Sequence, residues 1–167
     1  MKCRSFKPSI NENSEILILG SMPGVKSLEE SQYYAHPQNR FWRVMGVLCG
    51  DENLPSLKYS EKLKVLLDNK IALWDTIKSC EREGSLDCEI EKEIPNDING
   101  LLKKFKNIKM ICLNGNKSFS MFKKHFPDLL KTKRCLKMPS TSPANARYRI
   151  DNLIEEWQII TQKYDLK

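Results

Sequence analysis

The chain has 167 residues, 40% of them hydrophobic and 29% charged, which is typical of a single globular domain with one buried core. It carries 28 basic and 21 acidic residues, and this excess of positive charge suits a polyanionic partner such as DNA. No apolar run is long enough to cross a membrane, and the first residues lack the apolar segment of a signal peptide. We therefore expect a cytoplasmic protein with no membrane-spanning segment.

In chain order, residues 1–14 are predicted to be a polar lead-in, and short apolar runs predict strands at residues 15–19, 71–74, 108–113 and 135–138. Apolar residues at helical spacing predict helices at residues 39–49, 60–69, 97–105 and 146–164, another that ends near residue 125, and a helical turn at 25–31. Ser60 and either Asn96 or Asp97 are the predicted caps of two of these helices. The polar residues 78–93 predict a loop that can include a turn of helix. This alternation predicts a single α/β domain of three layers, with a short central, mostly parallel sheet flanked by helices.

The first predicted strand runs directly into a glycine-rich loop. The loop consists of Gly20, Ser21, Met22, Pro23 and Gly24. Ligands of open α/β sheets bind beyond the carboxyl ends of the strands, so this loop lies where a substrate would approach. It has neither the Gly-x-Gly-x-x-Gly pattern of dinucleotide sites nor the Gly-Lys-Ser/Thr of phosphate loops. An ordinary strand-to-helix turn is the alternative interpretation.

The segment YYAHPQNRFW follows, with stacking surfaces and hydrogen-bonding groups close together before a predicted helix. Tyr34 can stack on a base, and the alternative is a core tyrosine with a satisfied hydroxyl. The carboxamide of Asn39 offers both a donor and an acceptor, so it can orient water or bind a base, although an Asn here can also simply cap the helix. His36 can contact a sugar or a carbonyl, or order its own loop.

Two later strand ends carry further candidates. Asn114 ends the predicted strand 108–113 and can read a base edge, unless Asn114-Gly115 is only a turn. The loop of residues 139–145 offers backbone amides between prolines, before a predicted helix, which suits phosphate binding. Asn145 is alternatively the cap of that helix. Residues 31–50 and 131–150 contain no acid, so both chemistry-bearing segments are electropositive, although a lysine-rich solvated surface would look the same.

The strings GSMPG, YYAHPQNRFW and MPSTSPANAR together resemble the uracil-DNA glycosylase superfamily, and within it the hypoxanthine-DNA (deoxyinosine) glycosylase branch, over residues 14–160. The resemblance implies a monomeric, monofunctional glycosylase without a cofactor or metal. It would flip a deaminated base, preferably hypoxanthine, out of double-stranded DNA and hydrolyse the N-glycosidic bond, leaving an abasic site in base excision repair. The six scattered cysteines form no C-x-x-C pair, so zinc and iron–sulfur ligation are not predicted, and free thiols are expected in the cytoplasm.

The resemblance also implies roles for individual residues. It makes Asn39 the catalytic residue. It implies that the substrate contacts Gly20, Ser21, Met22, Pro23, Gly24, Tyr34, His36 and Asn114. It implies that DNA is held by Ser140, Thr141, Ser142, Pro143, Ala144, Asn145 and Arg147. Met22 departs from the pattern, because relatives carry Asn or Asp there, so this position supplies no group to activate water.

Other hypotheses remain at this point. The preferred base could be uracil, or the protein could bind damaged DNA without cleaving it, which the apolar Met22 favours. An α/β enzyme acting on free nucleosides is a third class, and it predicts a shallow dependence of binding on salt. Glu29 and Glu30 are a reserve choice of general base, and nothing marks Lys26 as a Schiff-base lysine.

Overall fold

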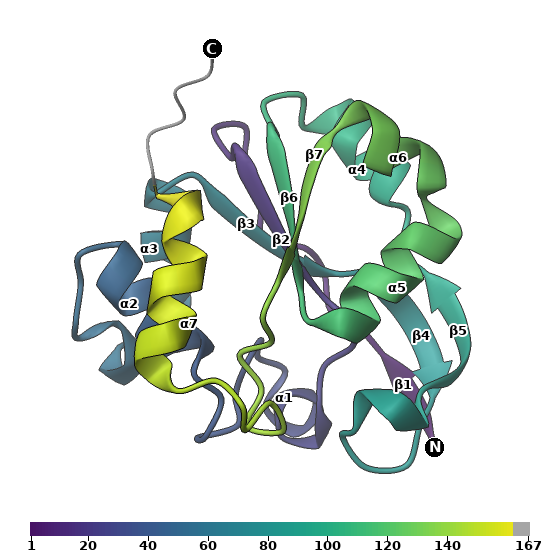
Figure 1. Cartoon of the computed structure of the whole chain (residues 1–167), viewed down its shortest axis with the longest axis horizontal. Helices are drawn as coiled ribbons and strands as arrows, with labels where there is room; N and C mark the ends of the chain where they lie inside the picture. Colours follow the sequence, from purple (N-terminus) through teal and green to yellow (C-terminus); the bar gives the residue numbers. More distant parts are fainter. Residues whose placement is uncertain (162–167) are drawn as a thin grey trace.

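The computed structural model describes residues 1–161 and has a parallel sheet at its centre, covered by helices on both faces (Figure 1). In spatial order, the strands of this sheet are β3 (Ile71–Asp75), β2 (Ile16–Gly20), β6 (Met110–Asn114) and β7 (Arg134–Met138). The four predicted strands are thus confirmed, close to their predicted bounds. Strand β2 pairs with β3 and β6 in parallel, and Gly20 lies opposite Asp75 in that register.

Strand β2 carries apolar side chains on both faces, and a layer of helices covers each face of the sheet. Ile16 and Ile18 pack into one core with α2 (Phe41–Leu48), α3 (Tyr59–Asp68) and α7 (Ile150–Trp157). Leu17 and Leu19 pack into the opposite core. The helices of that second layer are α4 (Ile98–Lys104), α5 (Asn116–His125) and α6 (Pro127–Thr132). The short helix α1 (Val25–Glu30) follows the first strand-end loop, as predicted. The predicted three-layer α/β class is confirmed.

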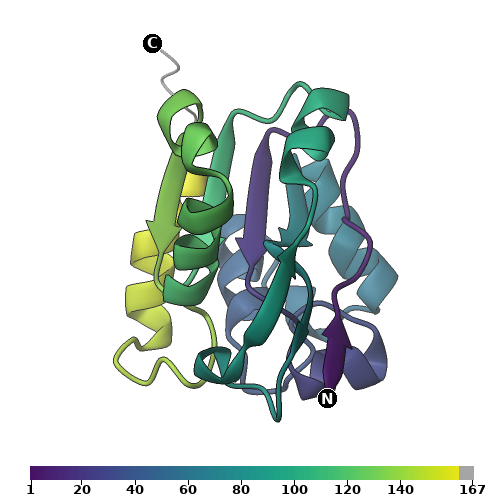
Figure 2. The ribbon, with the colours of Figure 1, turned by 90° about the vertical axis from the view of Figure 1, so that its right-hand side faces the viewer.

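A second, antiparallel sheet corrects two predictions. It consists of β1 (Lys2–Arg4), β4 (Ile77–Glu81) and β5 (Glu91–Pro95), with β4 in the middle, and Figure 2 shows it in front of the central sheet. Residues 1–14 are therefore more than a polar lead-in, and residues 78–93 are not simply a loop. These strands are short, β1 and β5 are mostly exposed, and irregular register between β4 and β5 breaks the alternation that predicts a strand. A 3-10 helix, Asp87–Glu89, lies between β4 and β5.

Several helix ends also differ from the predictions. The last helix begins at Ile150 after its N-cap Arg149, and a 3-10 helix (Gln158–Ile160) follows it, so residues 146–149 are not helical. The last part of the predicted helix, residues 162–164, lies outside the described residues. Helix α3 has Lys58 rather than Ser60 as its N-cap, and another 3-10 helix (Leu54–Ser56) precedes it. Asp97 caps α4 as predicted, because its Oδ1 accepts a hydrogen bond from the Gly100 amide at 2.9 Å.

Candidate active site

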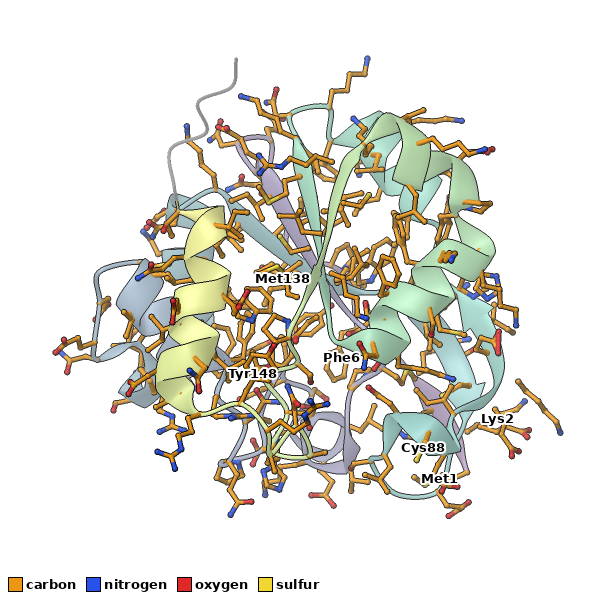
Figure 3. All side chains as sticks on the ribbon, in the orientation of Figure 1. Met1, Lys2, Phe6, Cys88, Met138 and Tyr148 are labelled. Carbon is orange, nitrogen blue, oxygen red and sulfur yellow. The ribbon has the colours of Figure 1, made fainter. Side chains whose placement is uncertain are left out.

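The carboxyl ends of the central strands lie toward the lower edge of the molecule in Figure 1. A cleft of about 1060 Å³ opens beside them. Every residue predicted for the site lines it, from the glycine-rich loop after β2 to Asn39, Asn114 and the loop that follows β7. Residues 85–88, between β4 and β5, form a further wall. In Figure 3, Tyr148 lies to the left and Cys88 to the right of this edge, and both belong to the lining. Parallel strands therefore bring together segments that are far apart in the sequence.

Gly20 permits the closest packing in the cleft. A Cβ at this position would lie 2.6 Å from Oδ1 of Asp75 and 3.2 Å from the hydroxyl of Tyr34, and the first of these distances is impossible for a real side chain. Two residues later, the side chain of Met22 is buried in an apolar cluster with Ile77 and Cys80. This packing explains why an apolar residue stands at position 22.

Tyr34 is fixed by contacts on its ring face and at its hydroxyl. Its ring stacks on Phe41, with centroids 3.9 Å apart, and its hydroxyl accepts a hydrogen bond from Nδ2 of Asn114 at 3.2 Å. Its backbone has a positive φ of 55°, which is uncommon for a bulky residue. Burial raises the pKa of the phenol, so Tyr34 is a neutral hydrogen-bonding group. The satisfied hydroxyl anticipated from sequence is present, yet the residue also lines the cleft.

Asn114 joins two walls of the cleft. Its Nδ2 also donates to Oγ1 of Thr141 at 3.1 Å, and its Oδ1 accepts from the Thr141 amide at 3.1 Å. Both amide hydrogens are therefore engaged within the protein. The side chain holds the loop after β7, residues 139–149, beside Tyr34; we call this segment the third loop. Gly115 follows with a φ of 99°, so the predicted Asn-Gly turn is present as well.

Arg40 holds the loop after β7, a role that the sequence did not reveal. Its buried guanidinium donates to the carbonyls of Thr141, Tyr148, Ser142 (2.8 Å) and Asn145 (3.1 Å). Arginine suits this task because its planar fork presents five donors in fixed directions. The only signal in the sequence was its position within HPQNRFW.

The loop of residues 139–149 corrects the predicted mode of phosphate binding. The amide of Ser142 donates to Oγ of Ser140, and the amide of Ala144 donates to Oγ of Ser142. Because these amides have partners, and α7 begins only at Ile150, no helix N-terminus presents free donors here. Asn145 does not cap a helix, since its Nδ2 donates to the carbonyl of Ser140 at 3.0 Å. Pro143, Ala144 and Arg147 form the exposed tip.

Asn39 and His36 both order their own segment. Oδ1 of Asn39 accepts a hydrogen bond from the Phe41 amide at 2.9 Å, in the manner of a cap, although Arg40 is the N-cap of α2. Its Nδ2 has no hydrogen-bond partner within residues 1–161, and the residue lines the cleft. Nδ1 of the exposed His36 accepts from the Gln38 amide at 3.1 Å, which is the loop-ordering role considered above.

Two carboxyl groups in the cleft were missed. Asp75, 3% exposed at the end of β3, accepts a hydrogen bond from Oγ of Ser5 at 2.7 Å, and burial raises its pKa to about 7. Asp87 accepts from Oγ of Ser21 at 2.7 Å, and burial raises its pKa too. Ligands bind beyond the carboxyl ends of parallel strands, so the residue that ends β3, Asp75, could have been predicted as a site residue. Nothing in the sequence indicated Asp87, because the segment around it resembles a polar loop.

Four cations and one further acid, the exposed Glu156, also line the cleft. Lys26, Lys117, Lys137 and Arg147 line the cleft, whereas Glu29 and Glu30 do not. The reserve hypothesis of a general base at these two glutamates is therefore wrong. Within residues 1–161, no three His, Cys, Asp or Glu side chains cluster in a way that could hold a metal ion. No helix in that range has the length and apolarity to span a membrane.

Comparison with known proteins places this geometry in a family. The profile of the uracil DNA glycosylase superfamily matches residues 8–161. The chain belongs to this superfamily. A hypoxanthine DNA glycosylase of Methanosarcina acetivorans is 40% identical over 159 residues, which cover 94% of this chain and 96% of that protein. A second, from Methanosarcina barkeri, is 47% identical over 118 residues, covering 71% and 74% of the two chains.

The fold of the superfamily is matched as well. A solution NMR structure of a Methanosarcina acetivorans protein assigned to the uracil DNA glycosylases superposes with a TM-score of 0.83. The two chains are 38% identical, and the match covers 96% of this chain and 98% of the other. The predicted resemblance is therefore confirmed at the level of family and fold.

Proposed function

We propose that this protein is a monofunctional DNA glycosylase that removes deaminated bases from double-stranded DNA, hypoxanthine in preference to uracil. The observation that carries this is a single cleft, lined by three strand-end loops, in a chain closely similar to hypoxanthine DNA glycosylases. The product is an abasic site for base excision repair, and the enzyme acts as a monomer of one domain.

The reaction requires that the site bind the extruded base firmly. Cleaving the C1′–N bond leaves negative charge on the base and positive charge on the sugar, so fixed donors and a stacking surface lower the barrier. Phe41 covers one face of the Tyr34 ring, and the ring lines the cleft, so its opposite face is positioned to stack on the base. Such stacking contributes about 1 to 3 kcal/mol per base.

The base edge meets the polar floor made by Asp75 and the hydroxyl of Tyr34. Hypoxanthine and uracil share a ring N–H beside a carbonyl, whereas adenine and cytosine have a bare ring nitrogen beside an amino group. An ionised Asp75 accepts from that N–H and repels the bare nitrogen, which favours hypoxanthine over adenine and uracil over cytosine. Asn114 positions this floor through its hydrogen bond to Tyr34.

Asn39 and the third loop complete the proposed site. The Nδ2 of Asn39, which has no partner in the described part of the chain, donates to the departing base or to the attacking water. The exposed tip at Pro143 and Ala144 enters the duplex and supports base extrusion, and Arg147 contacts the backbone. A non-catalytic binder of damaged DNA is the second candidate, favoured by the apolar burial of Met22.

The test is single-turnover excision on labelled duplexes that contain one deoxyinosine or one uracil, followed by alkaline cleavage. Wild type should release hypoxanthine faster than uracil. Asn39→Ala and Asn39→Asp should both lose most excision, because both lack Nδ2, while only the alanine variant loses the cap and about 1 kcal/mol of stability. Asn99→Ala, on the exposed side of α4, is the control.

Two outcomes would overturn the proposal. Wild type that binds the duplexes and leaves every base attached would establish the binder instead. An Asn39→Asp protein that is folded and excises at the wild-type rate would remove Asn39 from catalysis.

A further inference from the structure

The connection between β4 and β5 is attached by two hydrogen bonds to the glycine-rich loop and by a third to the first residue of α1. Nη2 of Arg82 donates to the carbonyl of Pro23, and the Val25 amide donates to Oγ of Ser85 at 2.8 Å. Oγ of Ser21 donates to Oδ1 of Asp87 at 2.7 Å. This segment is therefore a fixed wall of the cleft, and it holds the Asp87 carboxyl beside the loop.

The Asp87 carboxyl lies beside the glycine-rich loop, which has few polar side chains of its own. The side chain of Met22 is buried in an apolar cluster, which leaves Ser21 as the polar side chain of the loop. Within residues 1–161, the carboxyl groups that line the cleft are those of Asp75, Asp87 and the exposed Glu156. Asp87 is close enough to Asp75 and Tyr34 to influence the titration of both.

We propose that Asp87 is the general base that orients and deprotonates the attacking water, an inference that rests on the glycosylase function proposed above. The water oxygen forms a bond to C1′ as the C1′–N bond breaks, and the bonding electron pair leaves with the base. The water proton passes to the Asp87 carboxylate and then to solvent, and the base anion takes a proton from solvent. Water is the only co-reactant.

The surroundings of Asp87 and Asp75 give the two carboxyls different tasks. Burial raises the pKa of Asp87, while the hydrogen bond from Ser21 and the charges of Arg82 and Lys117 lower it. Asp75 and Tyr34 line the same cleft. Asp75 is almost fully buried, with a pKa of about 7, and suits contact with the base. Asp87 is less buried, and two cations favour its ionised form, which suits a carboxylate that accepts the proton of the attacking water.

The experiment compares Asp87→Asn with wild type in single-turnover excision of deoxyinosine from pH 5 to 9. Asparagine keeps an acceptor for Ser21 and removes the base, so the rate should fall about 10²- to 10⁴-fold. The pH dependence that remains should be that of Asp75 alone. Binding to a duplex with a non-cleavable 2′-fluoro-deoxyinosine should change less than about threefold. Glu89→Gln, an exposed acid of the same segment outside the cleft, should match wild type.

A second variant tests the same idea without touching the carboxyl. Lys117→Met removes a charge that lowers the Asp87 pKa, so the rising limb of the pH–rate profile should move to higher pH. A folded Asp87→Asn protein with the wild-type rate, or a Lys117→Met profile that does not move, would overturn the assignment. Wild type that releases no base would overturn the glycosylase function itself, so the two failures are distinguishable.

Discussion

At the scale of single residues, groups in the cleft serve both the fold and the proposed chemistry. Gly20 is needed because Oδ1 of Asp75 and the hydroxyl of Tyr34 occupy the space that a Cβ would take. Asp75 in turn is held almost out of water, with Ser5 as its hydrogen-bond donor. A titratable group with a strongly raised pKa in a cleft is typical of a functional site and destabilises the fold when it ionises.

Asp75 should therefore make the protein less stable as the pH rises. Its folded pKa, about 7, lies above the ordinary value of 3.8, so the folded state keeps a proton that the unfolded chain releases. Stability is lost between about pH 4 and pH 7. Asp75→Asn removes this effect and should stabilise the protein at pH 8, by no more than about 4 kcal/mol at 1.4 kcal/mol per pKa unit, while impairing excision.

Urea unfolding at pH 5, 6, 7 and 8 measures this directly. The difference between Asp75→Asn and wild type should grow with pH, and the exposed Glu52→Gln should follow wild type throughout. A difference that is constant with pH would show that Asp75 ionises as readily in the folded protein as in the unfolded chain.

At the scale of elements, two buried arginines hold the loops that form the cleft. Arg40 binds carbonyls of the loop after β7, and Arg82 binds the carbonyl of Pro23 in the loop after β2. Each arginine lies far in the sequence from the loop that it binds, so long-range contacts fix the conformation of both loops. This allows an irregular backbone to remain fixed at the carboxyl ends of the sheet.

Replacing Arg40 should release the third loop. Arg40→Lys keeps the charge and loses the planar fork, which should cost about 1.5 to 3 kcal/mol of unfolding free energy and most of the excision rate. Trypsin should then cut faster after Arg147, at the exposed tip. Arg43→Lys, exposed on the next turn, is the matched control, and equal cleavage rates in both variants would contradict the role of Arg40.

The difference between local sequence patterns and long-range contacts explains which parts of the fold the sequence could predict. The central strands were predictable because each is a continuous apolar run, and the strand-end rule then brought Asn39, Asn114 and the third loop to one place. The antiparallel sheet of β1, β4 and β5 was not predictable from the sequence. Its strand β5 is mostly exposed, and β1 is stabilised by pairing with β4, which is far away in the sequence. Asp87 depends on that sheet, so it could not be inferred from local pattern.

At the scale of the whole molecule, basic side chains from several elements line the cleft. The cations that line the cleft come from α1, α5, β7 and the third loop, so they face a single ligand from several sides. For DNA, each phosphate contact adds to the salt dependence of binding, whereas a free nucleoside would show almost none. The bulk charge of +7 alone would not distinguish these cases.

Binding to a deoxyinosine duplex should therefore weaken steeply with salt. Arg147→Ala should reduce the slope of log K against log salt by about one and weaken binding similarly for all sequences. Lys103→Ala, exposed on α4 outside the cleft, should leave the slope unchanged. A flat salt response of wild type, measured by fluorescence anisotropy, would argue for a nucleoside ligand.

The order of strands also has a consequence for synthesis on the ribosome. The interior strand β2 is made early, but its neighbours β3 and β6 follow later, and the edge strand β7 carries the third loop. A nascent chain that ends before β7 has the glycine-rich loop without the loop that Arg40 must hold. Such a fragment exposes the edge of β6 and has no complete cleft, so base-removing activity arises only when translation of the domain is nearly finished.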